Sequence, residues 1–173
     1  MNLEQRAKQF ATNAHAGQVR KYTGDPYISH PEAVADLVRS VVDHTEEMLA
    51  AAWLHDVVED TATTIEEVEL EFGHEVATLV GHLSDVSKPT DGNRSVRKAI
   101  DLAHTAKATL DAKTIKLADL INNSGSIVAH DPKFAKVYLR EKELLLEVLA
   151  EGDQSLFVKA QRILEEAETT IGK

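Results

Sequence analysis

The chain has 173 residues and a formal net charge of −10, with 43% hydrophobic and 28% charged residues, which is typical of one globular domain. It contains no cysteine, which excludes a disulfide framework, a thiolate zinc site and a cysteine nucleophile, and fits a cytoplasmic protein. The acidic balance argues against a nucleic-acid partner, and neither a signal peptide nor an apolar run of membrane-spanning length is evident. We therefore expect a single domain over residues 1–173, cytoplasmic, with no nucleic-acid or membrane partner.

The apolar residues of the first third of the chain follow a helical spacing. A loop over residues 18–29, marked by Gly24, Asp25 and Pro26, separates the first two predicted helices. Thr45 is placed to cap the third helix. The three helices are predicted to carry residues 3–14, 31–41 and 50–58.

The rest of the chain also has helical spacing, and no stretch alternates β-branched residues at period two. Thr64 and Glu67 have the spacing of a capping box, and Gly73 is placed to end that short helix. Further helices are predicted over residues 74–86, 94–110, 112–123, 132–149 and 154–169. The fold class is therefore all-α, with about eight to ten helices.

The most informative segment is residues 53–60, Trp-Leu-His-Asp-Val-Val-Glu-Asp. On a continuous helix, residues four apart share a face, so His55 pairs with Glu59 and Asp56 with Asp60. The apolar run directly before them predicts a buried helix. Three carboxylates and an imidazole crowded there would be costly without a cation, and a divalent metal is the simplest one. The alternative is a solvated acidic helix end.

Two further pieces contain isolated polar residues. Asp119 is a lone acid in an apolar helix, with Lys116 one turn before it and Asn123 one turn after it. A buried aspartate satisfied by Lys116 is the alternative to a functional acid. His30 stands before Pro31 at a helix entrance, where a capping or packing role is the alternative to metal binding.

Two small groups of basic residues could bind an anion. Arg20 and Lys21 lie beside Tyr22 in the first loop. Both side chains can grip phosphate, and arginine can also stack on a base. Solvated loop cations are the alternative. The second group consists of Arg94, Arg97 and Lys98.

Taken together, these pieces resemble the HD superfamily of metal-dependent phosphohydrolases, and the finer pattern is similar to the hydrolase domain of the RelA/SpoT family. The similarity covers nearly the whole chain, and its most specific parts are the His-Asp-x-x-Glu-Asp and Lys-Leu-Ala-Asp segments. The matching segments are residues 18–21 with Gly24, 27–31, 54–61, and 115–119 with Asn123. Because the family's synthetase and regulatory domains have no room here, the chain resembles a stand-alone small alarmone hydrolase, similar to the metazoan SpoT homologue.

The resemblance implies roles for individual residues. The implied metal ligands, usually for Mn²⁺, are His30, His55, Asp56 and Asp119. The implied catalytic acids that act on the attacking water are Glu59 and Asp60. The implied contacts to the nucleotide are Arg20, Lys21, Asn123 and Ser126. The chain departs from the family at Asn122, where an aromatic residue or histidine is common, and at Gly125, where arginine is common.

The implied reaction is hydrolysis of guanosine 3′,5′-bis(diphosphate), and of its 5′-triphosphate form, at the 3′ position. It releases pyrophosphate and GDP or GTP, so the expected partner is a small guanosine polyphosphate, and the chain could also form a homo-oligomer. The alternatives are an HD phosphatase acting on an adenosine alarmone, the phosphate of NADPH or a nucleoside monophosphate, and a helical binding module with a degenerate site.

Overall fold

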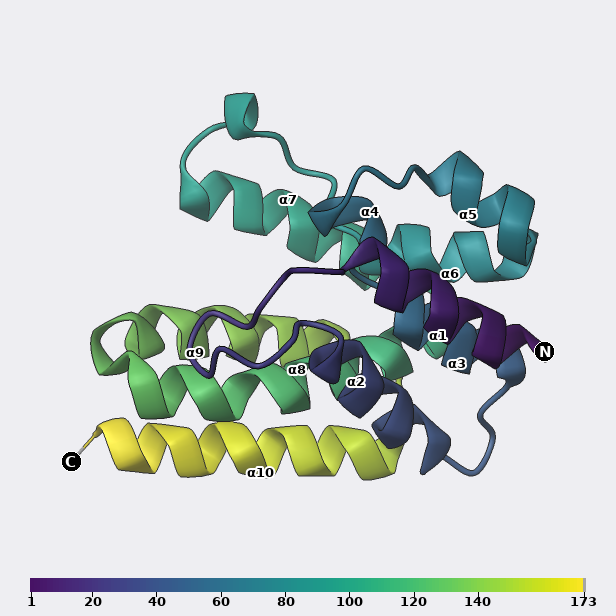
Figure 1. Ribbon diagram of the computed structural model, residues 1–173. Helices are drawn as coiled ribbons and strands as arrows, with labels where there is room; N and C mark the ends of the chain where they lie inside the picture. Colours follow the sequence, from purple (N-terminus) through teal and green to yellow (C-terminus); the bar gives the residue numbers. More distant parts are fainter. Residues whose placement is uncertain (173) are drawn as a thin grey trace. The chain divides into compact units, whose positions relative to one another are not determined.

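The computed structural model describes residues 1–172, without the side chains of Ser126 and Val128 (Figure 1). None of the described residues forms a strand, and they build ten α-helices and one short 3₁₀ helix, which confirms the predicted all-α class. The chain divides into two compact units, Met1–Ser84 and Asp85–Lys173. A single domain over residues 1–173 stays a prediction.

The first unit is organised around α3, a helix with no polar face. Its residues from Met48 to Leu54 are all buried. A helix that is apolar on every side must lie in the interior, and α1, α2 and α6 pack against it. The Thr45 side chain accepts a hydrogen bond from the Met48 N–H, which confirms the predicted cap. The helices of this unit are α1 (Leu3–Ala14), α2 (Ser29–Arg39), α3 (Glu46–Leu54), α4 (Val57–Asp60), α5 (Ile65–Phe72) and α6 (His74–Leu83).

In the second unit, α8 packs against α9 and α10, and the three helices lie side by side (Figure 1). The turn between α9 and α10 approaches α8 so closely that a Cβ added at Gly152 would lie 2.8 Å from Leu117 Cδ1. Only glycine therefore fits this turn without a shift of its neighbour. The helices are η1 (Pro89–Asp91), α7 (Arg94–Ala106), α8 (Leu110–His130), α9 (Pro132–Val148) and α10 (Gln154–Ile171).

Helix α8 is longer than predicted. The prediction ended it at residue 123, whereas it continues to His130. Gly125 inside it is tolerated, because an isolated glycine weakens a helix without stopping it. The stop comes from Pro132, since the residue before a proline disfavours helical geometry. Among residues 1–172, every helix is too short or too polar to cross a membrane.

The segment before α7 is tied to that helix by Asp101, which is buried. Its carboxylate accepts hydrogen bonds from the Val86 N–H, the Ser87 N–H and the Ser87 hydroxyl, at 2.7–2.9 Å. Burial raises the pKa of Asp101, but these hydrogen bonds outweigh it, so the pKa lies below its ordinary value. The carboxylate is thus held in its charged form.

We expect Asp101→Asn to lower the free energy of unfolding by about 1–2 kcal/mol at pH 7, because charged hydrogen bonds are lost. The lowered pKa means that the native state binds fewer protons than the unfolded state. The contribution is therefore complete above the unfolded pKa of about 3.9 and disappears as pH falls through the folded value. Urea unfolding of both proteins over a pH series measures this. A difference that stayed constant down to the lowest pH would contradict the assignment.

Candidate metal centre

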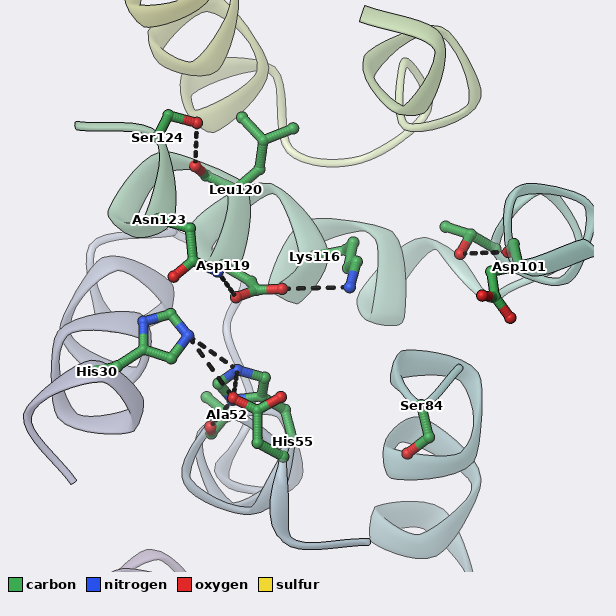
Figure 2. A network of polar contacts seen from close by, with 12 residues as sticks. His30, Ala52, His55, Ser84, Asp101, Lys116, Asp119, Leu120, Asn123 and Ser124 are labelled. Atoms are coloured by element: carbon green, nitrogen blue, oxygen red, sulfur yellow. Dashed lines mark hydrogen bonds and ion pairs between the residues drawn. The ribbon is translucent and has the colours of Figure 1, made fainter. Parts of the chain in front are cut away.

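Three metal-binding side chains converge in the first unit. His30 lies in the first turn of α2, and His55 and Asp56 directly follow α3. The two Nε2 atoms of the histidines are 3.2 Å apart, and Asp56 Oδ2 lies 3.0 Å from His55 Nε2 and 3.7 Å from His30 Nε2. Both histidines are almost fully buried, at 1% exposure. Figure 2 shows the two imidazoles facing each other.

The helix that carries this cluster ends earlier than predicted. The expected helix through residue 58 is wrong, because α3 stops at Leu54 and α4 starts a new single turn at Val57. The physical reason lies in His55, whose Nδ1 is 2.7 Å from the Ala52 carbonyl, one of the last carbonyls of α3. The imidazole thereby satisfies a terminal acceptor of the helix. The two polar pairs predicted on one continuous helix face are therefore split, with His55 and Asp56 in the junction between α3 and α4 and the two acids on α4.

The donor set fits a cation. A carbonyl oxygen can only accept a hydrogen bond, so Nδ1 of His55 carries a hydrogen, and in the neutral imidazole the lone pair of Nε2 points into the cluster. That lone pair lies opposite the Asp56 carboxylate and the His30 ring. The donor atoms of the three residues all lie within 4.8 Å of one another. A divalent metal ion satisfies all three donors at once.

The two predicted catalytic acids follow on α4. Glu59 and Asp60 are both exposed to water. Although Asp60 as a whole is exposed, its carboxyl group is partly shielded from water, which raises its pKa. The negative charge of Asp56 raises it further, against smaller lowering effects from His15 and Tyr27. A raised pKa makes this carboxylate a better proton acceptor near neutral pH than an ordinary aspartate.

Asp119 belongs to the second unit, where it is buried on α8. Its Oδ2 is 3.2 Å from Lys116 Nζ, and its Oδ1 accepts a hydrogen bond of 2.9 Å from Asn123 Nδ2 (Figure 2). The contact that the alternative interpretation expected, a pairing with Lys116, is therefore present. The role of Asp119 as a fourth metal ligand stays a prediction.

A residue that sequence analysis missed lies beside this group. Lys142 on α9 sits over the Tyr138 ring, with its Nζ 5.0 Å from the ring centroid. Burial, followed by the positive charge of Lys116, lowers its pKa to about 8. The missed signal was its register, because Lys142 falls between Tyr138 and Leu146 on the buried stripe of α9.

The first basic pair lies at the tip of a closed hairpin, residues 18–27. The Tyr27 N–H donates to the Gln18 carbonyl and the Arg20 N–H to the Asp25 carbonyl, at 2.9 and 2.8 Å. The turn is completed by Gly24, whose positive φ of 73° favours glycine. Lys21 is exposed at this tip, which suits binding of an anion from solution.

The structure also describes two residues of the second basic group, whereas it leaves out the side chain of one predicted nucleotide contact. Arg94 is held by Glu141 through two hydrogen bonds of 2.7 and 2.9 Å and lies over the Phe134 ring, so it stabilises the α7–α9 contact. The Nε of Arg97 is buried and has no hydrogen-bond partner among the described residues. The side chain of Ser126 lies outside the described residues.

Comparison with known proteins gives three consistent findings. The HD domain family model matches residues 7–150. The chain is 38% identical over 148 residues to a Synechocystis protein named probable guanosine-3′,5′-bis(diphosphate) 3′-pyrophosphohydrolase, covering 84% of this chain and 19% of that one. It is 40% identical over 119 residues to the human guanosine-3′,5′-bis(diphosphate) 3′-pyrophosphohydrolase MESH1, covering 68% of this chain and 65% of that one.

A solved structure is similar over nearly the whole chain. It is the metazoan orthologue of SpoT described as hydrolysing ppGpp, with a TM-score of 0.84, 28% identity, and coverage of 96% of both chains. The chain thus spans about a fifth of the length of the bacterial relative and slightly less than two thirds of the human one.

Proposed function

Because the chain belongs to the HD domain family, as its sequence motifs predicted, we propose that it is a metal-dependent hydrolase of guanosine 3′,5′-bis(diphosphate). The observation that carries this proposal is the buried convergence of His30, His55 and Asp56 next to the exposed acids of α4. The names of relatives at about 40% identity support the choice of substrate. The products are pyrophosphate and GDP, or GTP when the substrate carries a 5′-triphosphate.

In this proposal the first unit supplies three metal ligands, and Asp119 supplies a fourth. The donors are nitrogen and oxygen without sulfur, a set that suits Mn²⁺, Fe²⁺, Zn²⁺ or Ni²⁺, and Mn²⁺ is our choice from the family resemblance. When bound, such an ion lowers the pKa of water and neutralises charge that develops on phosphoryl oxygens.

The acids Glu59 and Asp60 orient the attacking water and accept its proton. The water oxygen forms a bond to the phosphorus attached to the nucleotide's 3′ oxygen, and the bond between that phosphorus and the 3′ oxygen breaks. The 3′ oxygen takes up a proton and becomes a hydroxyl group. The raised pKa of Asp60 supports this role, because proton transfer is most efficient when the acceptor's pKa approaches the working pH.

The net charge of −10 is compatible with an anionic substrate. Charges beyond a Debye length of roughly 8 Å are largely screened at physiological salt, so the local charge decides binding. Local cations are available in each unit: Arg20 and Lys21 on the hairpin, and Lys116 and Lys142 on α8 and α9. We propose that these residues supply positive potential for the phosphates.

We expect Arg20→Ala and Lys21→Ala to raise KM and leave kcat and metal content nearly unchanged, because lost uniform binding affects KM alone. Steady-state kinetics at low and high salt measure this. The loss should shrink at high salt if charge is its cause and persist if Arg20 stacks on the base. Lys159→Ala, which removes an exposed cation on α10, is the matched control. An unchanged KM in both hairpin variants would leave Arg20 and Lys21 as solvated cations.

The decisive test of function is incubation of the Mn²⁺-loaded chain with guanosine tetraphosphate and pentaphosphate, an adenosine alarmone, NADPH and nucleoside monophosphates. Release of pyrophosphate from the guanosine compounds is the expected result. Inorganic phosphate from another nucleotide would assign the chain to the alternative phosphatase class. No turnover despite full metal loading would favour the binding module. A cytoplasmic location, a partner set limited to small nucleotides and a homo-oligomeric state are further parts of the proposal.

A further inference from the structure

The base of the hairpin touches both Asp56 and Asp60. We infer that Gln18 and Tyr27 are positioning residues that fasten the acidic turn α4 to the ligand Asp56. This inference rests on the proposed function, since it concerns the same metal centre and the same water-activating acid. The sequence motifs included both residues but gave them no role.

Tyr27 contacts the side chains of the acidic residues. Its hydroxyl donates a hydrogen bond of 2.5 Å to Asp56 Oδ2, the oxygen that also faces both histidines. The Tyr27 side chain also lowers the pKa of Asp60, so it lies close to that second carboxyl group. A hydroxyl has a single hydrogen and an ionised carboxylate can only accept, so the hydrogen of Tyr27 is committed to Asp56. Hydrogen bonds to ligating carboxylates fix their rotation and tune metal binding.

The ring of Tyr27 is itself held in place. Its centroid lies 4.8 Å from that of His15 and 5.9 Å from that of His30, at tilts of 47° and 63°. His15 is only 2% exposed, so the ring that contacts Tyr27 is fixed in the interior. The hydroxyl therefore reaches Asp56 from a supported position and loses little side-chain freedom in doing so.

Gln18 holds the backbone at the end of α4. Its Nε2 donates a hydrogen bond of 2.9 Å to the carbonyl of Asp60. Its Oε1 lies 2.8 Å from His15 Nδ1, which donates to it. Both ends of the amide are thus used, and its orientation is determined by these two partners. The carbonyl held by Gln18 belongs to the same residue whose side chain meets Tyr27.

These contacts indicate two roles for the hairpin, substrate binding at its tip and positioning of the acids at its base. Backbone hydrogen bonds pair Gln18 with Tyr27 at its base, while Arg20 and Lys21 stand at its tip. The tip offers cations to the substrate, and the base sets the distance between the metal ligand Asp56 and the acid Asp60. Catalytic geometry depends on such support, because a displacement of about 1 Å can cost 10²-fold in rate.

The test compares Tyr27→Phe and Gln18→Met with the wild type in two measurements, direct titration with Mn²⁺ and steady-state kinetics at saturating Mn²⁺. Tyr27→Phe keeps the ring and removes the hydroxyl, so we expect metal affinity and kcat each to fall about 10–100-fold, with KM unchanged. Gln18→Met should lower kcat about 10-fold with unchanged metal affinity, because Gln18 touches no ligand. Ser84→Ala is the control, because it removes a buried hydroxyl that donates only to the Val80 carbonyl.

Wild-type metal affinity and kcat in Tyr27→Phe would overturn the inference, and so would an equal change in Ser84→Ala. A rise in KM with unchanged kcat would make the base of the hairpin part of substrate binding, which also contradicts positioning. The metal titration needs no nucleotide. If the wild type fails to hydrolyse guanosine polyphosphates, the proposed function fails, while the effect of Tyr27→Phe on Mn²⁺ affinity still decides this inference.

Discussion

Replacing His55 or Asp56 with alanine is expected to abolish both metal binding and hydrolysis. Each variant removes one of the three donors that converge within 4.8 Å, and we expect the incomplete set to lose the ion. In His55→Ala the Ala52 carbonyl also loses its imidazole partner, so the end of α3 is expected to loosen. Metal content of the purified proteins after loading and gel filtration is the measurement, with turnover of guanosine tetraphosphate alongside.

His44→Ala is the matched control for His55→Ala. His44 is a histidine of the same unit whose Nδ1 lies 2.6 Å from the carbonyl of Val41, three residues earlier, just as His55 Nδ1 meets the Ala52 carbonyl. The control therefore removes the same kind of local bond outside the cluster and should retain the metal. Full metal occupancy in either His55→Ala or Asp56→Ala would show that the centre lies elsewhere.

The second large effect is expected at the acids of α4. Glu59→Gln and Asp60→Asn should keep the metal and lower kcat about 10²–10⁴-fold, because a carboxamide has nearly the same size but cannot accept a proton from water. Single-turnover rates at saturating Mn²⁺ measure this directly. Glu66→Gln, which neutralises an exposed acid in the first turn of α5, is the control and should retain wild-type turnover.

The two variants also show which of the two acids is the general base that accepts the proton of the attacking water. If kcat of Glu59→Gln stays within a small factor of the wild type, Glu59 is a structural acid and Asp60 carries the role alone. If both variants retain wild-type turnover, neither residue accepts the proton, and the proposed mechanism is wrong.

Much of the fold could be predicted from local patterns. The helix over residues 3–14, the Thr45 cap and the Thr64–Glu67 capping box all lie where predicted, since each depends on residues within one or two turns. The end of α3 could not be predicted in this way. It depends on an imidazole that bonds to a carbonyl of the preceding turn, and periodicity treats His55 as one more helical residue.

The residues of the candidate site also divide into those that local sequence motifs could predict and those that depend on long-range contacts. His30, His55 and Asp56 were identified by motif and resemblance, and the structure brings them together. Gln18 and Tyr27 were overlooked because their contacts with Asp60 and Asp56 span 42 and 29 residues and follow no period. Lys142 could have been found, because a lysine in a buried helical register requires an explanation.

The end of α3 has an electrostatic consequence of its own. Aligned peptide dipoles place a partial charge of roughly −0.5 at the carboxyl end of a helix. In α3 this end lies inside the unit beside His55, whereas the opposite end carries Glu46 and Glu47. The backbone itself therefore attracts a cation to the cluster and repels an anion. No side-chain substitution removes this field, so phosphate groups have to be drawn in by cations from other elements, such as the tip of the hairpin.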